Sequence, residues 1–239
     1  MFGRIGRKIK KLSEYEKQRR FIADAGHEIK TPLAIIYADA DVLEMEVGKN
    51  EWLEDIRKQA KRLTGLMDDL IYMFSMEESD KKMQMMEFSF SDAVQDTLSS
   101  FQALEKIQNK NLQYIISSQI SMSGNEKAIR KLVNILMENA FKYSPENGLI
   151  MVEVQKNVKY VHLTVFNTTQ APISKEDREK MFERFCRLEA AYGTATEGYG
   201  IGLSIAKAIV QAHNGKIYAD AVGCNSLKIV VSLPLKNTC

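Results

Sequence analysis

Apolar residues recur at helical spacing along the first third of the chain, in two stripes separated by the turn signal Gly48-Lys49-Asn50. The second stripe is close to the a/d repeat of a coiled coil. Two amphipathic helices joined by a short turn form an antiparallel hairpin. Because one hairpin cannot cover both of its own stripes, the pattern predicts a homodimer through residues 10–80, in which two chains complete a four-helix bundle. The first stripe consists of Phe21, Leu33, Ile36, Ala40 and Leu43, and the second of Trp52, Ile56, Ala60, Leu63, Met67, Leu70 and Phe74.

The hydrophobic pattern changes after this hairpin. Residues 77–87 are polar and rich in methionine, a composition that indicates a linker. Since the hairpin is expected to extend to residue 80, we place the linker between the two domains at 81–88. Helical and strand-like patterns then alternate over 89–239, which predicts a second domain with both helices and a sheet. The expected helices are 91–108, 126–143 and 202–213, and the expected strands are 111–116, 149–155, 159–166, 215–221 and 226–233.

Composition narrows the class of protein. The chain has 239 residues, of which 45% are hydrophobic and 27% charged, which is typical of a globular protein and excludes collagen-like or largely disordered chains. No apolar run approaches the roughly 18–20 residues that span a bilayer, and the basic start lacks the apolar centre of a signal peptide. The three cysteines have no spacing typical of a disulfide framework or a zinc site: Cys186, Cys224 and Cys239. We therefore expect a reducing, cytoplasmic location.

Charge is unevenly distributed along the chain. Residues 1–20 carry eight Lys or Arg and two Glu, a net +6, so the other 219 residues carry −4 of the chain's total of +2. Such a basic segment either lies against the cytoplasmic face of a membrane, as the flank of a membrane anchor in a longer protein, or is the solvated start of a helix. Both interpretations stay open. No stripe of basic and aromatic residues follows, which argues against nucleic-acid binding.

A histidine near the start of the hairpin has neighbours suited to chemistry. On a helix, His27 and Thr31 are i, i+4 neighbours, with the Glu28 carboxylate adjacent to the imidazole. Pro32 lacks an N–H and crowds the Glu28 carbonyl, which predicts a kink just past the histidine. A neutral imidazole, with a pKa near 6.5, is a usable nucleophile, and a carboxylate can take its proton. A single histidine on a polar helix is nevertheless more often a solvated residue.

Two further clusters suit a phosphorylated ligand. Asn139, Lys142 and Tyr143 share one face of a helix and offer an amide oxygen, an ammonium group and an aromatic ring, although a plain polar helix side has the same pattern. Three glycines at G-x-G-x-G spacing precede a helix, where backbone N–H groups suit a phosphate chain: Gly198, Gly200 and Gly202. This spacing differs from the dinucleotide-binding fingerprint, and no phosphate-binding P-loop motif occurs in the chain. A flexible loop is the alternative for the glycines.

Taken together, four segments resemble, in order, the motifs of bacterial two-component sensor histidine kinases. Phe21–Leu33 is similar to the family's phosphoacceptor box. Ile129–Pro145 resembles the family's asparagine box, Phe182–Arg187 its phenylalanine box, and Glu197–Ala206 its second glycine box. The resemblance implies an antiparallel helical hairpin that forms a dimeric four-helix bundle, followed at 89–239 by an α/β sandwich ATP-binding domain with a mixed sheet.

The resemblance also implies a reaction. The γ-phosphoryl group of ATP, with Mg²⁺, would pass to His27, with Glu28 as base and orienter, and then to an aspartate of a response-regulator protein. Residues 28–31 match the family's phosphatase pattern too, in which Thr31 would help position the water that attacks the regulator's phospho-aspartate.

The family's motifs assign roles to the ATP-binding residues as well. The position of Asn139 would hold Mg²⁺, that of Lys142 would contact phosphate and that of Tyr143 would border adenine. Arg187 is a candidate contact of the γ-phosphate. Two phenylalanines are expected in the core or a hinge beneath the nucleotide lid: Phe182 and Phe185.

The chain departs from the family pattern at two places. The family's first glycine box usually reads D-x-G-x-G, but residues 166–173 contain neither Asp nor Gly. Asn167 matches the aspartate by residue type and Thr168 by spacing, and an uncharged partner predicts weaker adenine binding. Ile135 also replaces a family asparagine four residues before Asn139. Two alternatives to the kinase therefore remain, a phosphatase-biased or regulatory dimer with weak nucleotide binding and an ATPase or chaperone-type relative that hydrolyses ATP with water.

Overall fold

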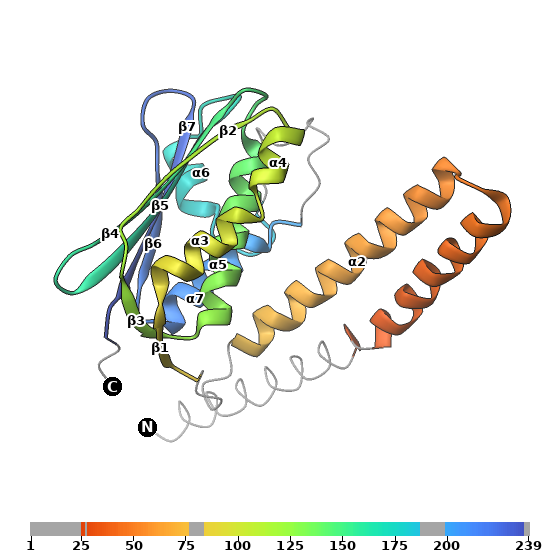
Figure 1. The fold of residues 1–239 in the computed structure, drawn as a ribbon, viewed down its shortest axis with the longest axis horizontal. Coiled ribbons are helices and arrows are strands. Elements are labelled where there is room, and N and C mark those ends of the chain that lie inside the picture. The colour runs from red at the N-terminus through yellow and green to blue at the C-terminus, as the bar shows by residue number, and fades with distance from the viewer. Residues whose placement is uncertain (1–24, 27, 77–83, 187–198, 237–239) are drawn as a thin grey trace, which may run out of the picture. The chain divides into compact units, whose positions relative to one another are not determined.

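The computed structural model describes residues 25–26, 28–76, 84–186 and 199–236. The chain divides into two compact units, residues 1–78 and 79–239 (Figure 1).

The first unit is the predicted antiparallel helical hairpin. Residues 28–47 are helical without interruption at Pro32, and α2 spans Glu51–Met76. Gly48 makes the turn with a φ of 79°, a left-handed conformation that glycine adopts at little cost. The Asn50 side chain then accepts a hydrogen bond from the Trp52 N–H at 2.9 Å, as an N-cap residue does.

Contacts along the hairpin hold its two helices together. At the open end, a Cβ added to Gly26 would lie 2.8 Å from the Ile71 side chain, so the helices approach closely there. Toward the turn, an ion pair joins Lys30 to Asp68. Nearer the turn, Arg57 pairs with both Asp41 and Glu44. The hairpin buries only part of its apolar side chains. Those that remain more than two-fifths exposed in the single chain include Ile36, Leu43, Trp52, Ile56 and Leu63.

The second unit is built on a mixed five-stranded sheet, as expected. Its strand order is β2-β4-β5-β7-β6, in which β2 and β4 are parallel and every other pair is antiparallel. The strands are β2 Asn111–Ile116, β4 Leu149–Lys156, β5 Tyr160–Thr168, β6 Lys216–Asp220 and β7 Ser226–Pro234. A separate antiparallel pair joins β1 Met86–Ser89 to β3 Ser121–Gly124.

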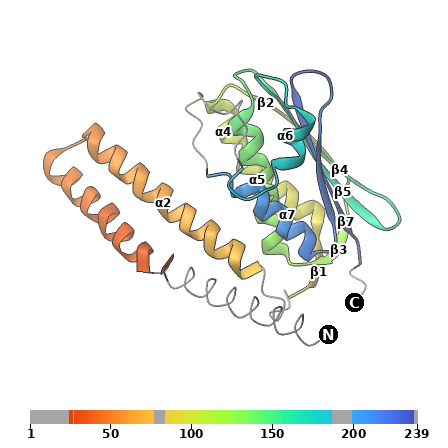
Figure 2. The same cartoon turned by 180° about the vertical axis from the view of Figure 1, so that it is seen from behind.

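Three helices cover one face of the large sheet, as both views of the ribbon show (Figures 1 and 2). They are α3 Phe90–Ser99, α5 Glu126–Tyr143 and α7 Gly202–Ala212, and two shorter helices are α4 Gln102–Ile107 and α6 Lys175–Lys180. Helix α5 packs on α3, on α7 and on β5. Alternate residues of the central strands are buried toward these helices, including Val152, Leu163 and Val231. The core of this unit therefore lies between one sheet face and the helix layer.

Most predicted elements of this unit are present, and one prediction was wrong. The expected helix 91–108 is two helices, because the Phe101 N–H bonds the Leu98 carbonyl at 2.9 Å in a tight turn. Phe101 is thereby buried, with its ring centroid 5.4 Å from that of Phe141. Strands β1 and β3 and helix α6 were not predicted, and β1 begins within the segment expected to be a linker. In the part of the chain that the structure describes, no helix has both the length and the apolar composition to cross a membrane.

Candidate functional site

Helix α5 carries three of the predicted site residues near its C-terminal end. The helix begins at an N-cap, Asn125, whose side chain accepts from the Ala128 N–H at 2.9 Å. Its apolar face, which includes Leu136, is fully buried against the sheet and the neighbouring helices. Half-buried positions at the margin of this face bring out the other predicted side chains: Asn139, Lys142 and Tyr143.

Hydrogen bonding leaves the Asn139 side-chain oxygen available. The Nδ2 group donates to the Ile135 carbonyl at 2.7 Å, and a carbonyl can only accept, so the amide orientation is settled. Oδ1 has no hydrogen-bond partner among the described residues. The Lys142 Nζ lies 4.9 Å from the Tyr143 ring centroid, within cation–π range. An oxygen ligand, a cation and an aromatic ring are thus grouped on one turn of helix.

The glycine segment lies against this group. Gly202 opens α7, and a Cβ added there would lie 3.4 Å from Ile135 and 3.7 Å from the Asn139 Nδ2. The N-cap residue of α7, Ile201, makes no side-chain hydrogen bond to the first turn. The N–H groups at the start of a helix attract an anion. Gly200 has a φ of 71°, and a Cβ there would lie 2.4 Å from the Cys186 carbonyl oxygen. The structure therefore brings Gly202 next to Asn139, while Gly200 lies against the backbone of Phe185 and Cys186.

The alternation of strand β5 favours Asn167 over Thr168 as the residue that faces the helices. Asn167 is buried on the same face as Val165, and its Nδ2 donates to the Thr168 carbonyl at 2.9 Å. Within the described residues its Oδ1 has no partner, so this atom is an acceptor. Thr168 instead uses its hydroxyl on the neighbouring strand, where it accepts from the Leu149 N–H at 3.1 Å.

The phosphoacceptor segment is described only in part. Glu28 and Thr31 are exposed on the first helix of the hairpin. Three predicted site residues lie outside the described residues: His27, Arg187 and Gly198. Of the two phenylalanines, Phe182 is buried as expected. Phe185 is not in the core, because it is 63% exposed and occupies a left-handed turn with a φ of 59° next to Gly200.

Sequence reasoning missed a lysine that supports the end of α5. The Lys110 ammonium donates to the carbonyl of Phe141, and to that of Ser144 at 2.9 Å. These carbonyls belong to the last turn of the helix, where no further backbone N–H groups follow to bond them. Partial burial lowers the pKa of Lys110. A lysine ahead of a strand gives no signal of this role, because its partners lie more than thirty residues away.

The described residues contain no group of three or more His, Cys, Asp or Glu side chains placed to hold a metal ion. A single amide oxygen such as Asn139 Oδ1 binds Mg²⁺ only weakly by itself. Mg²⁺ usually keeps several waters and shares substrate phosphates, so the donor set fits a cation that arrives with a nucleotide.

Comparison with known proteins places both units. Residues 17–79 match the family model of the His Kinase A phospho-acceptor domain. Residues 124–237 match the model described as histidine kinase-, DNA gyrase B-, and HSP90-like ATPase.

Curated relatives give the same result over nearly the whole chain. Sensor protein DltS of Streptococcus agalactiae is 31% identical over 223 residues, which are 93% of this chain and 56% of DltS. Signal transduction histidine-protein kinase BaeS of Escherichia coli is 29% identical over 228 residues, which are 94% of this chain and 49% of BaeS. The chain thus spans about half the length of the curated relatives it matches.

Solved structures share the fold. Full-length ShkA in complex with AMPPNP matches with a TM-score of 0.75 at 17% identity, over 90% of this chain and 45% of that one. Histidine kinase ThkA in complex with response regulator protein TrrA matches with a TM-score of 0.63 at 21% identity, over 93% of this chain and 66% of that one. On its two domain matches and these relatives, the chain belongs to the bacterial two-component sensor histidine kinases, with a phospho-acceptor domain ahead of an ATPase-type domain.

Proposed function

We propose that this chain is the catalytic part of a sensor kinase, which transfers the γ-phosphoryl group of ATP to His27 and then to an aspartate of a response regulator. The single observation that carries the nucleotide site is the contact between the start of α7 and Asn139. It places the start of α7, whose N-cap residue makes no side-chain hydrogen bond, beside the Asn139 amide, which lies one helical turn before Lys142 on α5. Phosphoryl transfer depends mainly on positioning and charge neutralisation, and this arrangement supplies both.

Each residue of the site has a distinct task in this proposal. The first turn of α7 and Lys142 bind the phosphate chain, while Tyr143 packs against the base. Asn167 Oδ1 accepts a hydrogen bond from the adenine amine. Asn139 would hold Mg²⁺, which when bound neutralises negative charge on the phosphates.

The phosphoacceptor step uses the residue next to the histidine. One His27 ring nitrogen bonds to the γ-phosphorus as the bond to the bridging oxygen breaks and ADP leaves. Glu28 takes the proton that the other ring nitrogen loses, so charge does not build up on the imidazole. Thr31 is the proposed residue that positions a water molecule for a second reaction, hydrolysis of the regulator's phospho-aspartate. Thr31→Ala should then lose regulator dephosphorylation and keep autophosphorylation, and equal loss of both activities would remove this assignment.

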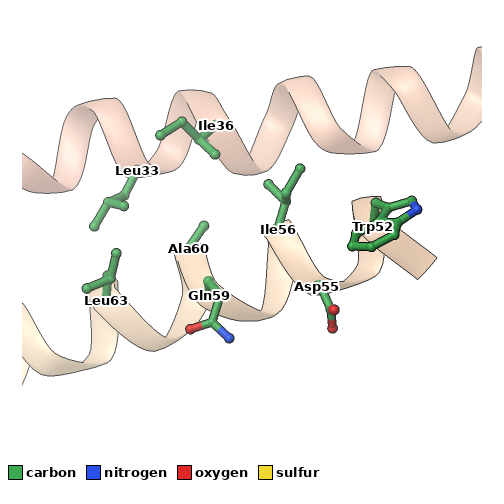
Figure 3. A pocket seen from close by; sticks show the side chains of 8 residues that line it. All are labelled: Leu33, Ile36, Trp52, Asp55, Ile56, Gln59, Ala60 and Leu63. Atoms are coloured by element: carbon green, nitrogen blue, oxygen red, sulfur yellow. The ribbon is translucent and has the colours of Figure 1, made fainter. Parts of the chain in front are cut away.

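A second copy of the chain is the proposed partner of the hairpin. Between its two helices lies an open hollow of about 370 Å³ with an almost wholly apolar lining (Figure 3). Leu33 and Leu63 point toward one another across it, while Ile56 and Trp52 follow toward the turn. Apolar side chains exposed in a continuous stripe are stabilised when a partner covers them. The match to a phospho-acceptor domain supports a homodimer through this surface.

The basic segment 1–20 supports a position at the cytoplasmic face of a membrane for the full-length protein.

A phosphatase-biased dimer with weak nucleotide binding is the second candidate function. The observation that favours it is Asn167, whose neutral oxygen replaces a carboxylate and so makes a weaker hydrogen bond with the adenine amine. Calorimetric titration with ATP separates the two, since millimolar or undetectable binding favours the second.

The decisive experiment for the kinase is incubation with γ-labelled ATP and Mg²⁺, with His27→Gln as the matched control. We expect label on the wild-type chain alone, and this label should be lost in acid and kept in base, as for a phosphoramidate. Absence of label on a folded wild-type dimer would reject the kinase and favour the phosphatase-biased dimer. Label on both chains would place the acceptor elsewhere.

A further inference from the structure

His213 is a fully buried, titratable side chain that the proposed chemistry does not use. It follows the last residue of α7 and has no solvent-exposed surface. Its Nδ1 lies 2.8 Å from the Ile209 carbonyl oxygen, and its Nε2 lies 3.0 Å from the backbone N of Asn125. A carbonyl only accepts and a backbone N–H only donates, so Nδ1 carries the proton and Nε2 is the acceptor.

Only the neutral imidazole can make both bonds. A protonated ring has two N–H donors and could not accept from Asn125. Burial lowers the pKa of His213 below its ordinary value of 6.5, which favours the same neutral form. The ring also fills its site closely, since a Cβ added to Gly124 would lie 3.0 Å from it. His213 is therefore held in one tautomer and one position.

The partner of His213 is a junction of three segments. Asn125 caps α5 through its side-chain oxygen, which accepts from Ala128 at 2.9 Å. Its Nδ2 donates to the carbonyl of Gln84, just ahead of β1, at 3.4 Å. Its backbone N–H donates to the Nε2 of His213. The bond thus ties the end of α7 to the start of α5.

Helices α5 and α7 are also in contact at their opposite ends. Gly202, at the start of α7, lies against Ile135 and Asn139 in the second half of α5. The two helices therefore run antiparallel, with one contact at the nucleotide site and the other about 16 Å away along α7, at 1.5 Å per residue. Helices of this length are stiff, so a change of register at His213 is transmitted to the first turn of α7.

We propose that His213 is a positioning residue for the nucleotide site. Its bond to Asn125 fixes the axial register of α7 along α5, and this register sets the first-turn N–H groups of α7 opposite Asn139. The inference rests on the proposed nucleotide binding and adds to it a residue that touches neither ATP nor metal.

The test uses two polar variants that differ in reach. Glutamine at 213 extends far enough to accept from the Asn125 N–H, whereas the shorter asparagine can bond only within its own helix. Calorimetry with a non-hydrolysable ATP analogue and Mg²⁺ should give an affinity about tenfold lower for His213→Asn and within about threefold of wild type for His213→Gln. Val154→Ala, which trims a buried side chain in β4, serves as the control for lost stability alone and should leave the affinity unchanged.

Equal affinities of His213→Asn and wild type, or equal losses in His213→Asn and Val154→Ala, would overturn the inference alone. A wild-type chain that binds no nucleotide would overturn the proposed function and the inference with it. Hydrogen exchange of the Asn125 amide gives a reading that needs no variant. Because linkage is reciprocal, the ATP analogue should slow that exchange, and an unchanged rate in the bound protein would contradict the proposed coupling.

Discussion

Replacement of Gly200 by alanine should damage the nucleotide site through two separate effects. The backbone there has a φ of 71°, and left-handed backbone costs an L-residue about 1–2 kcal/mol. In addition, the new Cβ would lie 2.4 Å from the Cys186 carbonyl oxygen and 2.8 Å from the Phe185 carbonyl carbon. Both are backbone atoms, so the chain must move, at a further cost of about 1–3 kcal/mol. The sum is a loss of about 2–5 kcal/mol in the free energy of unfolding.

Two other glycines separate these effects. Gly223 has a φ of 82° with no atom within 4 Å of an added Cβ, so Gly223→Ala carries only the conformational cost. Gly202 has no positive φ, and its added Cβ would make ordinary contacts at 3.4 and 3.7 Å. Alanine also favours a helix over glycine by about 1 kcal/mol, so Gly202→Ala should be neutral or slightly stabilising.

Urea unfolding of the three variants measures the stability loss, and titration with an ATP analogue measures the effect on the site. We expect the loss of unfolding free energy to be largest for Gly200→Ala, intermediate for Gly223→Ala and smallest for Gly202→Ala. Nucleotide affinity should fall in Gly200→Ala and stay unchanged in Gly223→Ala, because only the former displaces the segment ahead of α7. A Gly200→Ala protein no less stable than Gly223→Ala would refute the steric argument.

Three further outcomes are expected. Ile56→Asp puts a charge into the apolar stripe of the hairpin and should convert a dimer into a monomer in sedimentation, whereas the exposed Glu54→Gln should not. Lys110→Met removes the donor to two carbonyls at the end of α5 and should lower the free energy of unfolding by about 1–3 kcal/mol, while Lys106→Met on the exposed side of α4 should have little effect. Because burial lowers the pKa of His213, the unfolded chain binds its proton first as pH falls. The free energy of unfolding of the wild type should therefore fall as the pH drops below 6.5. Urea denaturation at pH 7.5 and 5.5 measures this loss, and the loss should be smaller in His213→Gln, which lacks the titrating imidazole.

Local sequence signals were enough for elements with strong caps. Helix α5 has the predicted bounds because Asn125 caps its start and Ser144-Pro145 ends it. The break between α3 and α4 was not predictable, because it depends on Phe101 packing against Phe141, forty residues later. Strands β1 and β3 have four residues each, too few for an alternating pattern to stand out.

The candidate site shows the same division. The motifs indicated Asn139 and Gly202 separately, and their proximity follows from the packing of α5 on α7. The choice between Asn167 and Thr168 could not be made by counting residues, since it depends on which face of β5 the helices cover. His213 gave no functional signal, because its partner lies 88 positions away.

The apolar stripe of the hairpin has a consequence for how the protein melts. The chain has two compact units, and the hairpin leaves much of its apolar surface exposed, which the proposed second copy would cover. Dissociation and melting of the hairpin are then one event, whose midpoint rises with protein concentration by mass action. The α/β unit has its own closed core and should melt at a temperature that dilution does not change. Two transitions, of which dilution moves only one, are the expected thermal signature of this architecture.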